Sequence, residues 1–229
     1  MEMVVDKEFF SISKERETLY SFLKIALEEP LTGDTLKLWK ENFSSEFIDV
    51  LTEDNEFLHK FFETLKRDDL SSIEQQERDA YFATFTMINT NGITPAPPWE
   101  SVYVTKDHSM FGDPVFQIRR KLDQFGLKFL KENIEPEDHI SIEIEFLIFL
   151  INYTNKALEA GNKTEYEEGI YTQYWLLKEH LNRWIQPFAE NILSSTTTSF
   201  YKGVAKLLYI FVNEDYEYMK SLKEGLENE

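Results

Sequence analysis

Two short segments of the 229-residue chain hold side chains that could bind or transform a ligand. The first is residues 97–103, Pro-Pro-Trp-Glu-Ser-Val-Tyr, where a rigid stretch leads into an aromatic, an acid, a hydroxyl and a second aromatic. Rigid aromatic side chains beside a carboxylate suit a peptide that carries both apolar and cationic residues. The structural alternative, a loop pinned to the core by Trp99 and Tyr103, stays open.

The second segment is residues 135–139, Glu-Pro-Glu-Asp-His. Its proline and carboxylates predict a helix start, because proline fits the first helical position and negative charge is favoured in the first turn. The adjacent Asp138 and His139 also form a carboxylate and imidazole pair that could face a guanidinium, a hydroxyl or a metal ion. A well-capped helix without a binding role is the open structural alternative.

Familiar catalytic signatures are missing: the sequence has no Gly-x-Gly-x-x-Gly, no phosphate loop, no Gly-x-Ser-x-Gly and no His-Glu-x-x-His. It also has no cysteine, which excludes disulfides, thiolate metal sites and cysteine nucleophiles. A metal site would need residues from distant segments, because no second histidine stands at helical spacing from His59, His108, His139 or His180. These absences count against an enzyme.

The composition limits the partners and the compartment. Lys and Arg number 24 against 42 Asp and Glu, and the net charge of −18 repels nucleic acid and anionic lipid while attracting basic segments. A surface that only keeps the protein soluble is the plainer alternative. The N-terminus lacks signal-peptide features, and the longest apolar run, residues 146–151, is too short to span a membrane. We expect a cytoplasmic protein without membrane insertion.

The residue pattern predicts a mostly helical chain. Only 8 Gly and 7 Pro disfavour a fold of many short strands, and 42% apolar residues supply the core of one domain. Apolar residues at helical spacing predict helices over residues 14–28, 35–42, 45–50, 55–66, 174–188 and 201–212. Ser71 and Glu74 stand in capping-box spacing and predict the start of a helix that reaches about Phe85.

A proline-rich break divides the chain into an N-terminal half, residues 1–88, and a C-terminal half, residues 113–229. Residues 89–112 between them predict a long packed loop. After it, Asp113 as N-cap and Pro114 as the first helical residue predict a helix to about Phe129. Residues 140–146 alternate like a strand, but their continuation to residue 160 is too long for one, so we expect a helix.

Six motifs follow one another along the chain: Tyr81-x-x-x-Phe85, Pro97-Pro98-Trp99-x-Ser101-Val102-Tyr103, Phe111-Gly112-Asp113, Glu135-Pro136-Glu137-Asp138-His139, His180-Leu181-x-x-Trp184 and Phe200-Tyr201. In this order, and at close to this spacing, they resemble a known family of assembly chaperones for molybdenum-containing reductases. These are the TorD/DmsD proteins, also called redox enzyme maturation proteins, and the chain is most similar to the DmsD-like members.

The resemblance implies an all-helical single domain, residues 1–229, of about ten helices in two halves joined by a hinge loop. It implies a cytoplasmic chaperone that binds the twin-arginine leader and the apo form of a DMSO or TMAO reductase catalytic subunit. Such a chaperone supports insertion of molybdopterin guanine dinucleotide and delays Tat export until folding is complete. The resemblance implies no covalent chemistry, so we expect a protein that is not an enzyme and has no metal site. We expect no tightly bound cofactor, only transient contact with the client's own. The Tat translocon and cofactor biosynthesis proteins are further candidate partners.

The resemblance also marks leader-binding positions: Tyr81, Gly112, Asp138 and His139, with Phe85, Trp99, Ser101 and Tyr103 as neighbouring motif positions. Glu100 joins them because the planar donors of arginine suit carboxylates such as Asp138 and Glu100. Family members often have tryptophan at Tyr81, and a similar member has a second tryptophan at Asn89, so we expect a different apolar groove and leader preference. The hinge loop is the expected place for the change that releases the leader.

Three alternatives remain. The first is a chaperone for a nitrate reductase or another molybdoenzyme that lacks an export leader. The second is a small metal-dependent hydrolase or nucleotide-binding protein using Glu137, Asp138 and His139, although this cluster alone makes an incomplete ligand shell. The third is an interaction module without a role in maturation.

Overall fold

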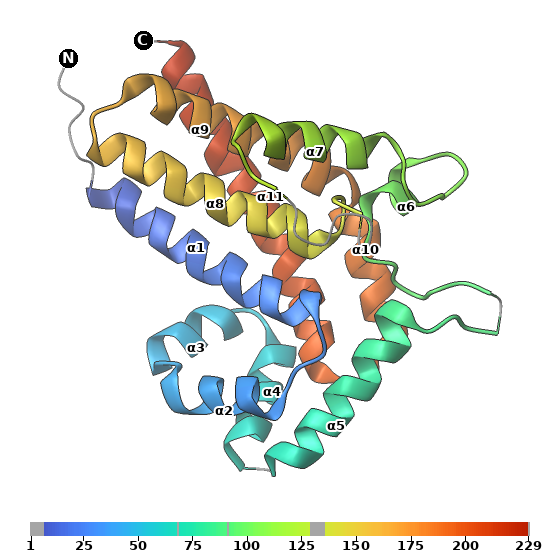
Figure 1. Cartoon of the computed structure of the whole chain (residues 1–229). Helices are drawn as coiled ribbons and strands as arrows, with labels where there is room; N and C mark the ends of the chain where they lie inside the picture. Colours follow the sequence, from blue (N-terminus) through green and yellow to red (C-terminus); the bar gives the residue numbers. More distant parts are fainter. Residues whose placement is uncertain (1–6, 68, 91, 129–135, 229) are drawn as a thin grey trace. The chain divides into compact units, whose positions relative to one another are not determined.

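Helices form nearly all the regular structure in the computed structural model, which describes residues 7–67, 69–90, 92–128 and 136–228 (Figure 1). The α-helices are α1 Lys7–Glu28, α2 Gly33–Asn42, α3 Ser45–Thr52, α4 Glu56–Arg67, α5 Leu70–Tyr81, α6 Glu100–Val104, α7 Asp113–Gln124, α8 Ile140–Glu159, α9 Lys163–Leu176, α10 Asn182–Ser195 and α11 Ser199–Glu227. Two π-helical turns, η1 Phe82–Thr86 and η2 Leu177–Leu181, continue α5 and α9. The described residues contain no named strand, which confirms the all-α prediction. None of the helices in these ranges combines the length and apolar character that a membrane span needs.

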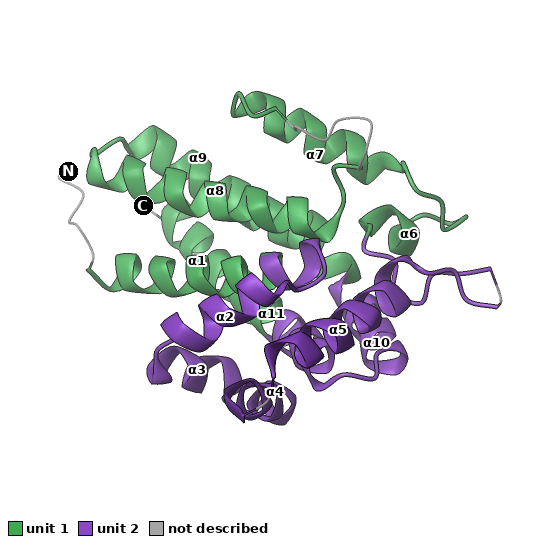
Figure 2. Cartoon of the chain, turned by 60° about the horizontal axis from the view of Figure 1, so that its bottom comes forward, with its two compact units in different colours: residues 1–24, 99–184, 211–229 green, residues 25–98, 185–210 purple. Residues whose placement is uncertain are grey.

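The chain forms two compact units, each assembled from separate stretches of sequence (Figure 2). Unit 1 comprises residues 1–24, 99–184 and 211–229, and unit 2 comprises residues 25–98 and 185–210. The divisions fall inside α1, α10 and α11, so each of these helices contributes residues to both units. The single domain with halves 1–88 and 113–229 stays a prediction.

Helix α8 is enclosed in unit 1, where it packs against α9. Ile142 and Ile144 are buried, and so are the polar residues Ser141 and Glu143 that alternate with them. Ser141 and Glu143, which a strand would turn toward solvent, are therefore buried as well, because residues 140–144 of α8 are all buried. The helix predicted here from the length of the apolar run is confirmed.

A buried ion pair joins the parts of α1 and α11 that belong to unit 1. Arg16 donates through Nε and Nη2 to the two carboxylate oxygens of Asp215, at 2.5 and 2.9 Å. The hydroxyl of Tyr20 donates to Asp215 Oδ2 at 2.7 Å. Two-point arginine pairs of this kind combine charge with fixed geometry, so this pair sets how the two helices meet within unit 1.

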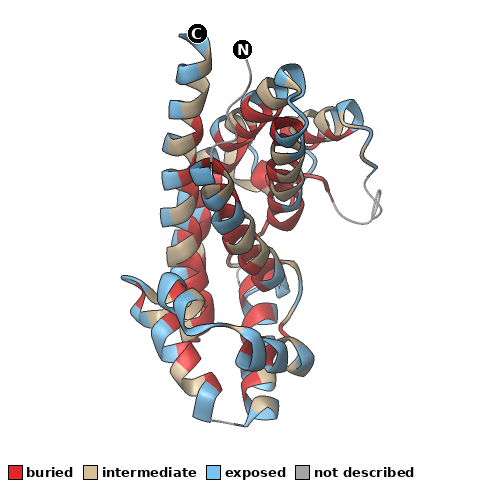
Figure 3. Ribbon diagram, turned by 90° about the vertical axis from the view of Figure 1, so that its left-hand side faces the viewer, coloured by how far each residue is buried: buried red, intermediate tan, exposed pale blue. Residues whose placement is uncertain are grey.

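An aromatic core fills unit 2, where the ring centroids of Phe61 and Trp39 lie 4.6 and 5.8 Å from that of Phe200. Helix α11 approaches α4 at Gly203, where an added Cβ would lie 2.5 Å from Leu58 Cγ. Only glycine fits at this contact. In both units, buried and exposed positions alternate with the helical repeat (Figure 3).

The capping box predicted at Ser71 and Glu74 is wrong. Helix α5 begins at Leu70, and its N-cap is Asp69, whose Oδ2 accepts a hydrogen bond from the backbone N–H of Ser72 at 3.2 Å. Glu74 instead accepts from Arg78 at 2.7 Å. Aspartate caps a helix as well as serine does, and the earlier residue sets the start.

Two further boundaries differ from the prediction. Helix α6 interrupts the segment predicted as an unbroken loop, residues 89–112. Helix α7 has Gly112 as its N-cap rather than Asp113, and it ends at Gln124, where Gly126 turns the chain with φ +67°. Phe129, the predicted end of that helix, lies outside the described residues.

Candidate functional site

The two segments singled out in the sequence meet in unit 1. Trp99 and His139 form an isolated antiparallel bridge, and the backbone N–H of Glu100 donates to the carbonyl oxygen of Asp138 at 3.0 Å. The Trp99 and His139 rings lie edge to face, with centroids 5.8 Å apart. Residues 99–103 and 136–139 of unit 1 therefore form one site, while Glu135 lies outside the described residues.

The prediction that a helix begins at Pro136 is wrong. Helix α8 begins at Ile140, and residues 137–138 form a turn before it. His139 is the N-cap, and its Nδ1 accepts a hydrogen bond from the backbone N–H of Ser141 at 3.2 Å. Because Asp138 precedes this cap, its carboxyl group is available to another segment.

The Asp138 carboxyl group caps the N-terminus of α6. Its Oδ2 accepts a hydrogen bond from the backbone N–H of Ser101 at 2.8 Å, and the residue has no exposed surface. Burial raises the pKa of Asp138, the Ser101 hydrogen bonds lower it in part, and the charge of Glu100 raises it again. Asp138 thus acts on α6 as an N-cap does, but from a distant segment.

Gly112 packs closely against Ser101 and Thr105 of the α6 segment. Its backbone N–H donates to Ser101 Oγ at 3.0 Å, while the Thr105 hydroxyl donates to the carbonyl oxygen of Ser101 at 2.7 Å. A Cβ added at Gly112 would lie 2.6 Å from Thr105 Cγ2 and 3.0 Å from Ser101 Oγ. Only glycine permits this close approach, which explains the residue in physical terms.

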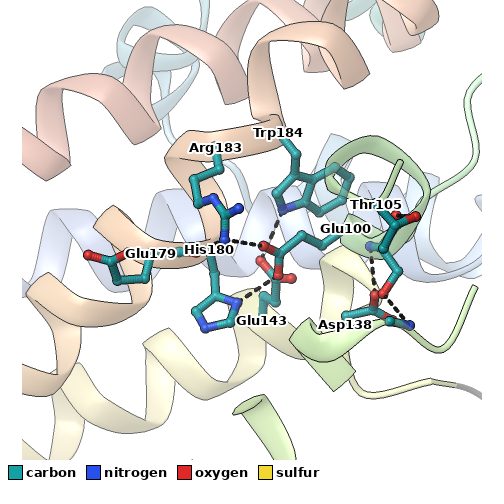
Figure 4. Close-up of polar contacts among 10 residues, drawn as sticks. Glu100, Thr105, Asp138, Glu143, Glu179, His180, Arg183 and Trp184 are labelled. Carbon is teal, nitrogen blue, oxygen red and sulfur yellow. Dashed lines mark hydrogen bonds and ion pairs between the residues drawn. The ribbon is translucent and has the colours of Figure 1, made fainter. Parts of the chain in front are cut away.

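Glu100 lies in a second buried cluster (Figure 4). Its Oε2 lies 2.6 Å from His180 Nδ1, and its Oε1 lies 3.9 Å from Arg183 Nη1. Trp184 Nε1 donates to Glu143 Oε2 at 3.3 Å. Glu100, Glu143 and His180 are fully buried, offer ligand atoms within 4.8 Å of one another, and point toward one another from α6, α8 and η2.

Sequence reasoning missed Glu143 and gave His180 no binding role. Burial raises the pKa of Glu143 far above its usual value, and the charges of Glu100 and Asp138 raise it further. The available signal was an acid within residues 140–151, where apolar residues predominate, because a buried carboxyl group needs a partner. Which residue is the partner follows only from the fold. Glu143 pairs with Trp184, and Glu100 pairs with His180, 80 positions further along the chain.

Glu137, Asp138 and His139 do not converge on one point. Glu137 forms a two-point ion pair with Arg119 at 2.6 and 3.0 Å, whereas Asp138 and His139 bind Ser101 and Ser141. The alternative of a metal-dependent hydrolase built on these three adjacent residues is therefore wrong.

The remaining candidate residues are aromatic. In unit 1, the Tyr103 ring lies 5.4 Å from the Trp184 ring, and Tyr103 is half-buried. In unit 2, Tyr81 and Phe85 are buried with ring centroids 5.0 Å apart, and the Tyr81 hydroxyl donates to the carbonyl oxygen of Glu28 at 2.9 Å. Tyr81 and Phe85 therefore belong to the core of unit 2 in this state.

Apolar side chains are exposed at both ends of the segment that links the sequence motifs. Met87, Ile88 and Ile93 are exposed in unit 2, and Met110, Phe111 and Phe116 are exposed in unit 1. His108 and Phe111 have φ of 52° and 65°, in the left-handed region that L residues rarely adopt. Exposed apolar surface and strained backbone are both typical of binding segments.

A family model described as "Nitrate reductase delta subunit" matches residues 49–190. A protein of Vibrio vulnificus (strain YJ016), named "Chaperone protein TorD", is 26% identical over 217 residues, which cover 93% of this chain and 98% of the relative. A protein of the same name from Aliivibrio fischeri is 26% identical over 215 residues, with the same coverage.

Among solved structures, the fold is similar to that of a redox enzyme maturation protein candidate from Archaeoglobus fulgidus. The TM-score is 0.50 at 22% identity, and the match covers 86% of this chain and 93% of the other. This likeness shows a shared fold. The match of the family model includes both segments that meet at the Trp99–His139 bridge.

Proposed function

The chain belongs to the nitrate reductase delta subunit and TorD family of molybdoenzyme maturation chaperones, and from this premise we propose that it binds the twin-arginine leader of its client. The client is the cofactor-free catalytic subunit of a DMSO or TMAO reductase. The chaperone holds this subunit in the cytoplasm for insertion of molybdopterin guanine dinucleotide and delays Tat export until folding is complete. It performs no covalent chemistry.

One observation carries this proposal. Two sequence motifs of the family, residues 97–103 and 136–139, join at the bridge between Trp99 and His139. The paired segments bring the rings of Trp99 and His139 together in one region of unit 1. The carboxyl groups of Glu100 and Asp138 and the short helix α6 lie in the same region. Such a region suits a peptide that has cationic and apolar parts.

The carboxyl groups of Glu100 and Asp138 are buried and already have internal partners. A leader arginine therefore reaches them only if residues 99–112 move, and binding to arginine then replaces the internal hydrogen bonds. The positive φ angles at His108 and Phe111 store strain in this segment, which lowers the free energy needed to move it. Moderate affinity follows, as a chaperone that must release its client requires.

The apolar stretch of the leader would bind exposed apolar side chains, which each unit offers. Ile88 and Ile93 are 70% and 61% exposed, and Phe111 is 65% exposed. Burying such side chains against a peptide is favourable by about 25 cal/mol per Å² of apolar area. The net charge of −18 speeds encounter with the basic end of the leader.

Calorimetric titration of the full chain with a synthetic twin-arginine leader tests this proposal. We expect micromolar or tighter binding that weakens at least about tenfold when both arginines are replaced by lysine, because lysine lacks the two-point donor geometry. Asp138→Asn keeps an acceptor for Ser101 but removes the charge, so it should weaken binding while Asp107→Asn, at an exposed position, should not. Equal binding of both peptides would contradict arginine recognition.

A second candidate is supported by the description of the family model, which names nitrate reductase. In this case the client is a molybdoenzyme without an export leader, and the chaperone binds its folded surface or N-terminal segment. Binding to a cofactor-free nitrate reductase subunit, together with no binding to any twin-arginine leader, would favour this client. Capture of a leader-bearing subunit only would exclude it.

A further inference from the structure

Four buried polar atoms in unit 1 lack a hydrogen-bond partner among the described residues. They are Glu100 Oε1, Asp138 Oδ1, Glu143 Oε1 and His180 Nε2. Buried polar atoms in folded proteins nearly always bind a protein group, an ordered water or an ion. Several such atoms gather around Glu100 and Glu143, as polar atoms do where a protein binds an ion.

The charges of the cluster point to a cation. Glu100, Asp138 and Glu143 are three buried carboxyl groups, and the cationic side chain found at ion-pair distance within the described residues is Arg183, 3.9 Å from Glu100 Oε1. Buried charges are stable when they are paired or coordinate a metal. The three buried carboxyl groups thus outnumber the one cationic side chain within reach, and a bound cation would supply a further partner for them.

We propose that Glu100, Glu143 and His180 bind one divalent transition-metal ion that links α6, α8 and η2. One ligand atom from each of the three lies within 4.8 Å of the others. Metal–ligand distances of about 2.0–2.2 Å place two ligands of one ion at most about 4.4 Å apart, so small side-chain shifts bring all three atoms onto a single ion. A set of imidazole nitrogen and carboxylate oxygens suits Zn²⁺ or Mn²⁺. Asp138, whose charge acts on Glu143, offers a further oxygen.

The surroundings orient these ligands. Trp184 donates to Glu143 Oε2 and leaves Oε1 for the ion, while the Trp175 ring stands edge to face against His180 with centroids 4.5 Å apart. Outer partners of this kind position metal ligands in known sites. His180 also lies in the π-helical turn η2, and such turns occur frequently at functional sites.

A shared proton is the competing occupant. A proton shared between Glu100 and Glu143 neutralises one charge but provides no hydrogen-bond partner for Asp138 Oδ1 or His180 Nε2. The two occupants differ in their response to Glu143→Gln. The glutamine amide can donate to Glu100 as a protonated glutamate would, but it is a poor metal ligand, so this variant mimics the proton and removes the ion.

The first experiment measures metal in the full chain purified from cells grown with added zinc. Because the cluster is fully buried, the ion should enter during folding and resist a brief exposure to chelator. We expect about one Zn²⁺ per chain by elemental analysis and native mass spectrometry. Glu143→Gln should retain at least about tenfold less, whereas Glu145→Gln, two residues further along α8 and 65% exposed, should retain the wild-type amount.

The second experiment unfolds the protein, removes metal with a chelator, and refolds it with Zn²⁺, Mn²⁺ or Ca²⁺. Zn²⁺ should raise the Tm of the wild type by about 5 °C and leave Glu143→Gln unchanged, and Ca²⁺, which prefers all-oxygen ligands, should have no effect. His180→Gln should also lose the response, whereas His59→Gln, at an exposed position of α4, should keep it. Less than about 0.1 ion per wild-type chain, or equal metal content in Glu143→Gln, would overturn the proposal. It does not depend on leader binding, and failure of the leader titration would leave it standing.

Discussion

Glu100 and His180 are 80 positions apart in the sequence, yet Glu100 Oε2 and His180 Nδ1 lie 2.6 Å apart with both side chains fully buried. This contact ties α6, the short helix inside the predicted hinge loop, to the π-helical turn η2. Asp138 ties the same helix to the segment before α8 through Ser101. Two buried carboxyl groups therefore hold α6, and any movement of residues 99–112 must break hydrogen bonds to both.

Replacing Gly112 with alanine should destabilise the protein. The new Cβ would lie 2.6 Å from Thr105 Cγ2, and relieving that overlap should cost about 1–3 kcal/mol of unfolding free energy. Urea unfolding followed by circular dichroism measures the change. The second replacement Thr105→Ser removes Cγ2 but keeps the hydroxyl, so Gly112→Ala/Thr105→Ser should recover part of the loss.

Gly225→Ala is the matched control, because no atom of the described residues lies within 4 Å of a Cβ added at Gly225 in helix α11. Alanine should stabilise that helix by up to about 1 kcal/mol. If Gly112→Ala were as stable as Gly225→Ala, the close approach of Gly112 to Thr105 would not exist in solution.

Breaking the buried pair of Arg16 and Asp215 should be costly. Arg16→Met leaves the Asp215 carboxylate buried with only the Tyr20 hydroxyl as a partner, and the expected loss of unfolding free energy is about 3–5 kcal/mol. Arg16→Met/Asp215→Leu removes both charges and should recover most of the loss. Thermal and urea unfolding of the single and double variants measure both effects.

The exposed ion pair of Lys14 and Glu17 is the control for the Arg16 and Asp215 variants. Lys14 has 75% side-chain exposure, and Lys14→Met should change stability by less than about 1 kcal/mol. A similarly small effect of Arg16→Met would show that the buried pair does not form.

Sequence reasoning predicted most helices, because apolar residues at spacings of three and four report which face is buried. It also selected the two segments that meet at Trp99 and His139. It did not find the partners of Glu100, since no local pattern connects residue 100 to residue 180. The wrong start at Pro136 has a different cause: proline and acids suit a first turn, but His139 caps the helix three residues later and Asp138 caps another helix. The leader-binding role of these residues stays a prediction.

Stability should depend on pH through Glu77. Burial raises the pKa of this carboxyl group from 4.5 to about 7 in the folded protein, although a hydrogen bond with Thr198 opposes the shift. As pH rises, the unfolded chain loses this proton first, because its Glu77 has the lower pKa. The contribution of neutral Glu77 to the free energy of unfolding is therefore complete below about pH 4.5 and lost as the pH rises through about 7. The expected loss is about 3 kcal/mol.

Glu77→Gln stays neutral and should escape this loss, so its advantage over the wild type should grow between pH 5 and pH 8. Urea unfolding at several pH values measures the difference. Asp79→Asn, an exposed position on the same helix, should show no such trend. A constant difference between Glu77→Gln and the wild type across this range would contradict the raised pKa.

Ile88→Ser should weaken leader binding without affecting the fold. Ile88 is 70% exposed, so its loss should leave the Tm nearly unchanged, while a leader that buries this side chain should bind about tenfold more weakly. Calorimetric titration measures the affinity. Leu38→Ser, at a position 58% exposed in α2, should bind the leader as the wild type does. Equal losses in both variants would point to a nonspecific apolar effect.

The central claim is that the protein recognises a leader-bearing reductase subunit before its cofactor is inserted. Its most direct test is co-purification of the full chain with the catalytic subunit produced in four forms, with and without the leader and with and without molybdopterin guanine dinucleotide. We predict a stable complex with the cofactor-free, leader-bearing subunit and at least about tenfold less with the cofactor-loaded forms. Equal recovery of the loaded and cofactor-free subunits, or no recovery of any form, would contradict the claim.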